Sequence, residues 1–144
     1  MGERDVARLL DRVAKADLLG PRTQCVHMTD LGEQDIALLA QTGAHVVHCP
    51  QSNMKLASGA CPVSKLLERG VNVALGTDGA ASNNDLNMFG EMQAAALLGK
   101  LTASDAAALP AEDSLYMATM GGARAMGLDQ QIGSLEVGKQ ADLI

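Results

Sequence analysis

The stretch VNVALGTDGAASNND (residues 71–85) passes directly from an apolar run to a polar loop. Its first half, VNVALGT, is the clearest candidate strand in the chain, and DGAASNND is rich in turn-forming residues. Two earlier runs follow the same pattern, TQCVHM (23–28) and AHVVHC (44–49). We therefore predict three short strands. Because their apolar residues do not alternate with polar ones, both faces of the sheet are expected to be covered.

Segments with helical periodicity separate these strands. The second predicted helix lies between the first two strands, with Asp30 in its N-cap region and Gly43 just past its end. Strands that alternate with helices are typical of a parallel sheet in an α/β protein. The predicted helices cover residues 4–17, 31–42, 62–69, 86–100, 103–108 and 111–126, while 50–60 is predicted as a loop and 131–144 as a turn-rich stretch that begins a strand.

Composition and charge exclude several functions. The 144 residues, a length that suits one domain, carry 11 Lys and Arg against 17 Asp and Glu, a formal net charge of −6. The basic residues are scattered, so we expect no nucleic-acid binding and no polybasic membrane anchor. No apolar run approaches the ~20 residues of a membrane span, and no signal-peptide apolar region is present at the start. Three cysteines without CxxC spacing predict reduced thiols and a cytoplasmic location.

Each predicted strand ends in a residue that can carry chemistry: His27, His48 and Asp78. In parallel α/β folds the C-terminal ends of the strands meet at one mouth, where active sites lie. Two imidazoles and a carboxylate at such a mouth indicate metal binding or proton transfer. Each residue also has a structural interpretation, because a single histidine at a strand end is more often structural and Asp78 in GTDG suits a turn or a helix cap. The equivalent positions of the three favour the functional interpretation.

Two loops carry further polar candidates. In QSNMKLASG, Ser52, Asn53 and Lys55 can contact a polar ligand, although local hydrogen bonds within the loop are the commoner role for Ser52. In DGAASNND, the polar residues 82–85 are expected to cap the following helix. His45 precedes the second strand proper and is expected at the surface.

Two long motifs resemble a known family. VVHCPQSNMKLASG (46–59) and ALGTDGAASNNDLNMF (74–89), supported by LLGPRTQCVHMTD, MATMGGARAMGL and IGSLEVGKQADLI, are similar to the chlorohydrolase and deaminase branch of the amidohydrolase superfamily. The greatest likeness is to the 5-methylthioadenosine/S-adenosylhomocysteine deaminases, and it covers nearly the whole chain. The resemblance implies a partial (β/α)8 TIM barrel, strands six to eight with their helices, over residues 1–130. Residues 131–144 would then begin the return into a small flanking β-domain, which is truncated.

The resemblance also implies roles for the strand-end residues. Asp78 matches the strand-eight aspartate, which binds the divalent metal, usually zinc, and helps to move the proton of the attacking water. His27 resembles the strand-six histidine near the reacting edge of the substrate, although some relatives have a second histidine where Gln24 stands. His48 lies at the strand-seven mouth, where it would contact substrate. The implied reaction is deamination of a purine nucleoside, such as 5-methylthioadenosine or S-adenosylhomocysteine, by attack of a metal-bound water.

Part of the family's metal site has no counterpart in this chain. The family also uses a His-x-His pair on strand one, a histidine on strand five and a glutamate three residues after it. This chain has three histidines and no His-x-His, so Asp78 is the one ligand it supplies, whereas a catalytic zinc needs about three protein ligands plus water. We expect a fragment or subunit that is inactive alone and buries its strands against an N-terminal barrel half or by self-association.

Other functions stay open on the sequence. A guanine deaminase or a triazine-type chlorohydrolase is the nearest alternative, because the barrel is shared and the pocket loops decide the substrate. A non-catalytic assembly or binding module is a second class, which the missing ligands favour for this chain in isolation. A structural α/β domain with incidental polar strand ends is a third, and its stability would not depend on a metal.

Overall fold

Three parallel strands form one sheet in the computed structural model, which describes residues 9–142. The strands follow the order β1-β2-β3, and Val46 of the middle strand pairs with Cys25 on one side and Val73 on the other. All three carboxyl ends therefore lie at the same edge of the sheet. The predicted α/β class with a parallel sheet is confirmed. The strands are β1 Gln24–Val26, β2 His45–His48 and β3 Val73–Leu75.

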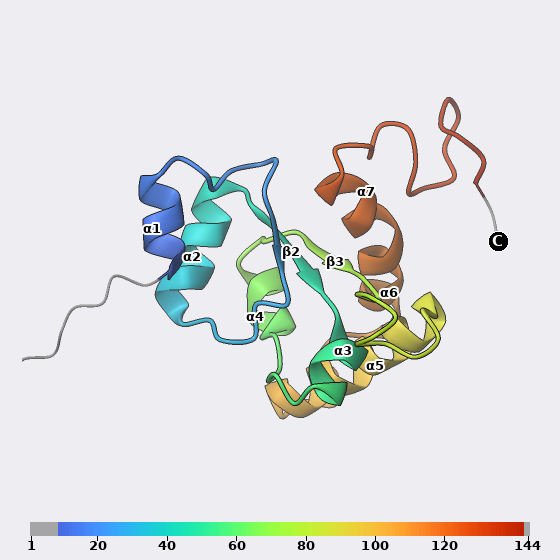
Figure 1. Ribbon diagram of the computed structural model, residues 1–144. Helices are drawn as coiled ribbons and strands as arrows, with labels where there is room; N and C mark the ends of the chain where they lie inside the picture. Colours follow the sequence, from blue (N-terminus) through green and yellow to red (C-terminus); the bar gives the residue numbers. More distant parts are fainter. Residues whose placement is uncertain (1–8, 143–144) are drawn as a thin grey trace, which may run out of the picture.

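Helices fill the connections between the strands and follow the last of them (Figure 1). The helix predicted over residues 4–17 is confirmed from residue 9 onward, and its first residues lie outside the described range. The long segment after β3 contains one π-helical turn, η1, between two α-helical pieces. The helices are α1 Leu9–Lys15, α2 Glu33–Thr42, α3 Pro50–Lys55, α4 Val63–Glu68, α5 Met88–Ala103, α6 Ala111–Tyr116, η1 Met117–Gly121 and α7 Gly122–Ala125.

Three stretches differ from the sequence predictions. The loop predicted over 50–60 contains α3, because Pro50 takes the first helical position, where its missing N–H costs no helical hydrogen bond. The helix predicted over 103–108 is absent, since α5 ends when Ser104 adopts the left-handed conformation at φ 53°. Residues 129–142 contain neither helix nor strand, and this segment (red) runs away from the sheet after α7 (Figure 1).

The helix ends show which polar side chains act as caps. Gly43 follows α2 at φ 72°, as predicted. The start of α2 lies later than Asp30, because the Asp35 carboxylate accepts the Gly32 N–H at 2.8 Å. For α5 the cap is Asn87, whose Oδ1 accepts the Phe89 N–H at 3.0 Å. The prediction that residues 82–85 cap this helix is wrong.

The core lies between the sheet and the helices α2, α4, α5 and η1. Ile36, Leu39, Leu66 and Met117 are fully buried there. β3 is buried along its whole length, as expected for a strand covered on both faces. The same expectation is wrong for β1, where Val26 is 47% exposed. Both β1 and β3 have one neighbouring strand, but η1, α4, α5 and α7 pack against β3, whereas β2 is the main described element in contact with β1.

The π-helical turn η1 packs directly on β3. A Cβ at Gly121 would collide with the carbonyl oxygen of Val73, so only glycine allows this approach. Beside this contact, Asn72 Nδ2 donates to the Gly121 carbonyl at 2.9 Å and to His45 Nδ1 at 3.1 Å. His45 Nε2 then donates to the Pro21 carbonyl at 3.1 Å. His45, expected at the surface, is instead the first residue of β2 and joins the starts of the strands.

His48, at the end of β2, is a core residue. It is 1% exposed, and its Nδ1 has no hydrogen-bond partner within the described part of the chain. Burial lowers the pKa of the imidazole to about 4, with a smaller contribution from the nearby His27. The ring is therefore neutral at pH 7.

No helix between residues 9 and 142 has both the length and the apolar character that a bilayer crossing requires.

We predict that Gly121→Ala lowers the free energy of unfolding by about 1–3 kcal/mol, the usual cost of forcing extra volume into a packed core. Urea unfolding of the chain measures this change. Gly122→Ala is the matched control, because a Cβ at this position meets no atom within 4 Å. The control variant should be neutral or slightly stabilised. Equal stability of the two variants would contradict the packing of η1 on β3.

We also predict that the protein loses stability as pH falls below 6.5, the ordinary pKa of the imidazole. The unfolded chain binds a proton on His48 below that pH, while the folded chain binds it only near pH 4. Between about pH 7 and about pH 5 the loss should be about 2 kcal/mol. Urea unfolding of the wild-type chain and of His48→Gln at both pH values isolates this contribution. Identical pH dependence in the two proteins would exclude it.

Candidate active site

The parallel sheet brings His27 and Asp78 together. His27 directly follows β1, and Asp78 lies three residues beyond β3, so both leave the sheet at its carboxyl edge. His27 Nε2 lies 3.8 Å from Asp78 Oδ2. The two side chains are 40% and 32% exposed, so the pair is open to a ligand. Of the three predicted strand-end residues, these two converge at an accessible site.

Both residues have left-handed backbone conformations. The φ angle is 70° at His27 and 61° at Asp78. Neither residue is glycine, and such a conformation costs of order 1–3 kcal/mol. It persists only where the surroundings hold it, and the His27 N–H donates to the Val47 carbonyl at 2.9 Å. Six further non-glycine residues between 9 and 142 share this conformation, so it does not by itself mark a functional site.

Asp78 is held as an ionised carboxylate. Its Oδ2 accepts hydrogen bonds from the hydroxyls of Ser82 and Ser52, each at 2.7 Å. The Ser82 bond, the Ser52 bond and a backbone bond from Gly79 lower the pKa of Asp78 to about 2. An efficient general base has a pKa near the working pH. The low pKa therefore suits Asp78 better to binding a cation than to accepting a proton.

His27 is oriented by a second segment of chain. Its Nδ1 lies 2.9 Å from Asn53 Oδ1, which can only accept, so Nδ1 carries the proton. In the neutral ring, Nε2 is then an acceptor that faces the Asp78 carboxylate. Two acceptors that face each other across 3.8 Å attract a proton, a metal ion or a donor group of a ligand between them.

Behind Asp78 a second set of bonds holds the loop after β3. Glu91 of α5 is fully buried and bonds to the Asn83 side chain and to the backbone of Gln51. Lys55 Nζ donates to Asn84 Oδ1 at 2.7 Å and to the loop backbone at 3.1 Å. Sequence reasoning missed Glu91 altogether, because a glutamate in an amphipathic helix gives no signal of burial. The sequence predicted local hydrogen bonds for Ser52, but its hydroxyl bonds to Asp78, 26 residues away.

His48 and two cysteine thiols are buried. His48 shares the carboxyl edge with the pair, but its ring is covered, so its assigned contact with substrate stays a prediction. The thiols of Cys49 and Cys61 are also buried, and burial raises their pKa values to about 11 and about 12. Thiols with such pKa values are protonated and weakly reactive at pH 7.

These residues do not form a complete metal centre by themselves. From residue 9 to residue 142, no group of three or more His, Cys, Asp or Glu side chains is arranged to hold a metal ion. A catalytic zinc needs about three protein ligands. Asp78 and His27 Nε2 together offer at most two ligands, fewer than that number.

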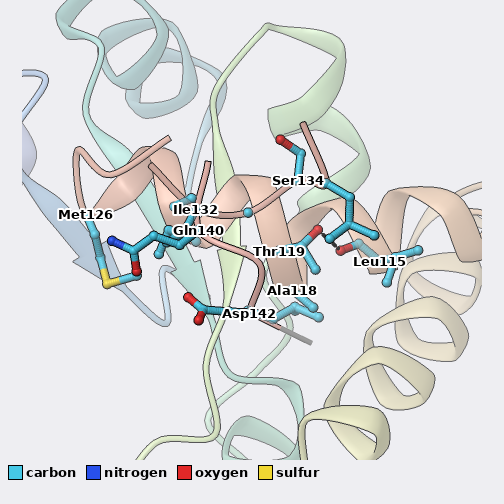
Figure 2. Close-up of a pocket in the computed structure, with 13 residues that line it drawn as sticks. Leu115, Ala118, Thr119, Met126, Ile132, Ser134, Gln140 and Asp142 are labelled. Carbon is cyan, nitrogen blue, oxygen red and sulfur yellow. Dashed lines mark hydrogen bonds between the residues drawn. The ribbon is translucent and has the colours of Figure 1, made fainter. Parts of the chain in front are cut away.

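A hollow of about 640 Å³ lies away from this pair, between η1, α7 and the C-terminal tail. Figure 2 shows Met126 and Gln140 at one end of it and Leu115 at the other. Its lining is mostly apolar and includes none of the predicted site residues. The hollow therefore offers no chemistry to the candidate active site.

Curated proteins match the chain along almost its full length. A 5-methylthioadenosine/S-adenosylhomocysteine deaminase of Teredinibacter turnerae is 64% identical over 137 residues, which are 95% of this chain and 31% of the relative. A 5'-deoxyadenosine deaminase of Methanothermobacter thermautotrophicus is 54% identical over 127 residues, 88% of this chain and 29% of the relative. The chain thus spans under a third of these relatives' length.

Solved structures match the fold as well. An adenosine deaminase from Xanthomonas campestris with bound zinc has a TM-score of 0.92 and 56% identity over 94% of this chain and 31% of its own. A guanine deaminase of E. coli has a TM-score of 0.83 and 32% identity over 92% of this chain and 30% of its own. The model of the amidohydrolase family matches residues 2–144. The chain therefore belongs to the amidohydrolase family.

Proposed function

We propose that this chain is a fragment or subunit of a metal-dependent hydrolase that deaminates a purine nucleoside by attack of a metal-bound water. One observation carries the proposal: the ionised Asp78 carboxylate is held by two serines opposite His27, at the mouth of a parallel sheet. The identity to 5-methylthioadenosine/S-adenosylhomocysteine deaminases, 64% and 61% for two of them, supports this substrate class. Removal of an amino group from a cyclic amidine is the reaction type.

The three strands correspond, in this proposal, to strands six, seven and eight of a (β/α)8 barrel. Residues 1–130 belong to the barrel and 131–144 begin the return into a flanking β-domain. The parallel order of the strands and the partial coverage of the relatives support this assignment. So does the free edge of β1, with which a further barrel strand would pair.

Asp78 supplies one ligand of the metal, which we take to be zinc because the Xanthomonas campestris relative binds it. The remaining ligands come from a partner, either an N-terminal barrel half or a second copy of the chain. His27 acts at the reacting edge of the substrate, where its Nε2 faces the same space as Asp78. His48 contributes to the substrate side of the strand-seven mouth. The chain alone is inactive, and we place the enzyme in the cytoplasm.

The alternatives from the same superfamily have weaker support. The guanine deaminase and the triazine hydrolases are 29–32% identical to this chain, about half the identity of the methylthioadenosine-type deaminases. A non-catalytic assembly module is favoured by the incomplete ligand set. The accessible Asp78 carboxylate, held by two serines opposite His27, argues against it, because a passive module does not need such a group.

We predict that the isolated chain holds almost no zinc after incubation with the metal and desalting, because it supplies too few ligands. Elemental analysis of the purified protein measures the stoichiometry. One tightly bound zinc per chain would show that the site is completed within this chain or by its self-association. A size measurement on the same sample separates those two cases.

A chimeric enzyme tests the deaminase function. The matching segment of the Xanthomonas campestris adenosine deaminase is replaced by this chain, and release of ammonia is measured with methylthioadenosine, S-adenosylhomocysteine, guanine and a triazine. We expect turnover of the two adenosine compounds, and Asp78→Asn should lower it by on the order of a thousandfold. Asp129→Asn, in the C-terminal tail, is the matched control and should leave turnover unchanged.

Preferred turnover of guanine or the triazine would assign the alternative substrate. A folded, zinc-loaded chimera without any turnover would favour the non-catalytic module. Full activity of the Asp78→Asn chimera would remove Asp78 from the site.

A further inference from the structure

Glu91 is an ionisable residue in the core. Its side chain is 0% exposed. Oε1 accepts a hydrogen bond from Asn83 Nδ2 at 2.5 Å, and Oε2 accepts one from the Gln51 backbone N–H at 3.3 Å. Burial raises the pKa of this carboxyl group, while the two donors lower it. Burying such a group costs stability unless its bonds are made, so the two donors define a fixed anchor.

Each donor to Glu91 is the chain neighbour of a serine that binds Asp78. Gln51 precedes Ser52 in α3, and Asn83 follows Ser82 in the loop after β3. The two serine hydroxyls meet at Asp78 Oδ2. One buried carboxylate of α5 therefore holds both segments that hold the exposed carboxylate of the candidate site.

The Asn83 side chain extends this anchor through the loop. While its Nδ2 donates to Glu91, its Oδ1 accepts the backbone N–H groups of Asp85 and Leu86, each at 3.2 Å. The Asn83 backbone N–H donates to the Gly79 carbonyl at 2.9 Å, next to Asp78. The amide is thus oriented from both ends, and reversing it would place a donor against two donors.

We propose that Glu91 is a positioning residue: it joins α3 to the loop after β3 and so fixes the direction of the Asp78 carboxylate. The catalytic meaning of this anchor rests on the proposed deaminase function. The anchor itself is a property of the fold, and it is tested without metal, substrate or turnover.

Exchanging donors and acceptors provides the test. In Glu91→Gln, the two carboxylate oxygens become one carbonyl oxygen, which accepts, and one NH2 group, which donates. The new side chain therefore cannot accept hydrogen bonds from both the Gln51 N–H and Asn83 Nδ2. In Asn83→Asp, two carboxylates face each other. The double variant Asn83→Asp/Glu91→Gln restores the pairing in reverse, because the new carboxamide at position 91 donates to the new carboxylate at position 83. That carboxamide still accepts from the Gln51 N–H, and the new carboxylate still accepts from the N–H groups of residues 85 and 86.

Two measurements on the isotope-labelled 144-residue chain report the anchor. Hydrogen exchange at the amides of Asp85 and Leu86 should quicken by roughly ten- to a hundredfold in each single variant, as expected for one lost bond to a buried charged group. The carbon chemical shift of the Asp78 carboxyl group, at constant pH, should move in both. In the double variant both signals should return toward wild type.

Glu112→Gln makes the same chemical change at an exposed position of α6 and should alter neither signal. A double variant whose changes equal the sum of the two single variants would overturn the proposal, because a packing role alone is not restored by reversing polarity. An unchanged Asp78 signal in Glu91→Gln would overturn it too. A zinc-free or inactive chain leaves both readouts intact, so failure of the deaminase function is distinguishable.

Discussion

Two serine hydroxyls on one oxygen of Asp78 determine the geometry of the candidate site. Ser52 and Ser82 approach the carboxylate from different segments, so the group is held from two directions. Because both hydroxyls donate, they favour the ionised form, which is why the pKa falls to about 2. The charge and the direction of this carboxylate thus have one physical origin.

The parallel sheet decides which strand-end residues can work together. Strand direction places His27, His48 and Asp78 at one edge, yet the middle residue is removed from solvent. Along β2, Val46 and His48 are buried while the residues between and before them are half-buried, as the alternation of side chains requires. His48 therefore belongs to the core face of β2. An accessible pair forms from the two outer strands alone.

Local patterns in the sequence were enough to predict the three strands, the left-handed glycine after α2 and the edge at which the polar residues gather. They were insufficient wherever a side chain bonds to a distant segment. Ser52 and Asp78 are 26 residues apart, and Gln51 and Glu91 are 40 apart. The cap of α5 is Asn87, because the helix begins at Met88, later than the predicted start at residue 86. The bonds between distant segments depend on the tertiary fold, and no periodicity in a single chain encodes them.

The state of the pair also explains how a family member can carry part of a metal site. The serine hydroxyls fix the direction of the Asp78 carboxylate, and its pKa of about 2 keeps it ionised even in acidic solution, where an ordinary aspartate binds protons that compete with a metal. His27, with its proton directed to Asn53, presents a lone pair to the same space. In the proposed function, this side of the metal site would need no rearrangement before a cation binds. In the proposed function, the described residues provide too few metal ligands, and a partner would provide the remaining ligands without having to reshape Asp78.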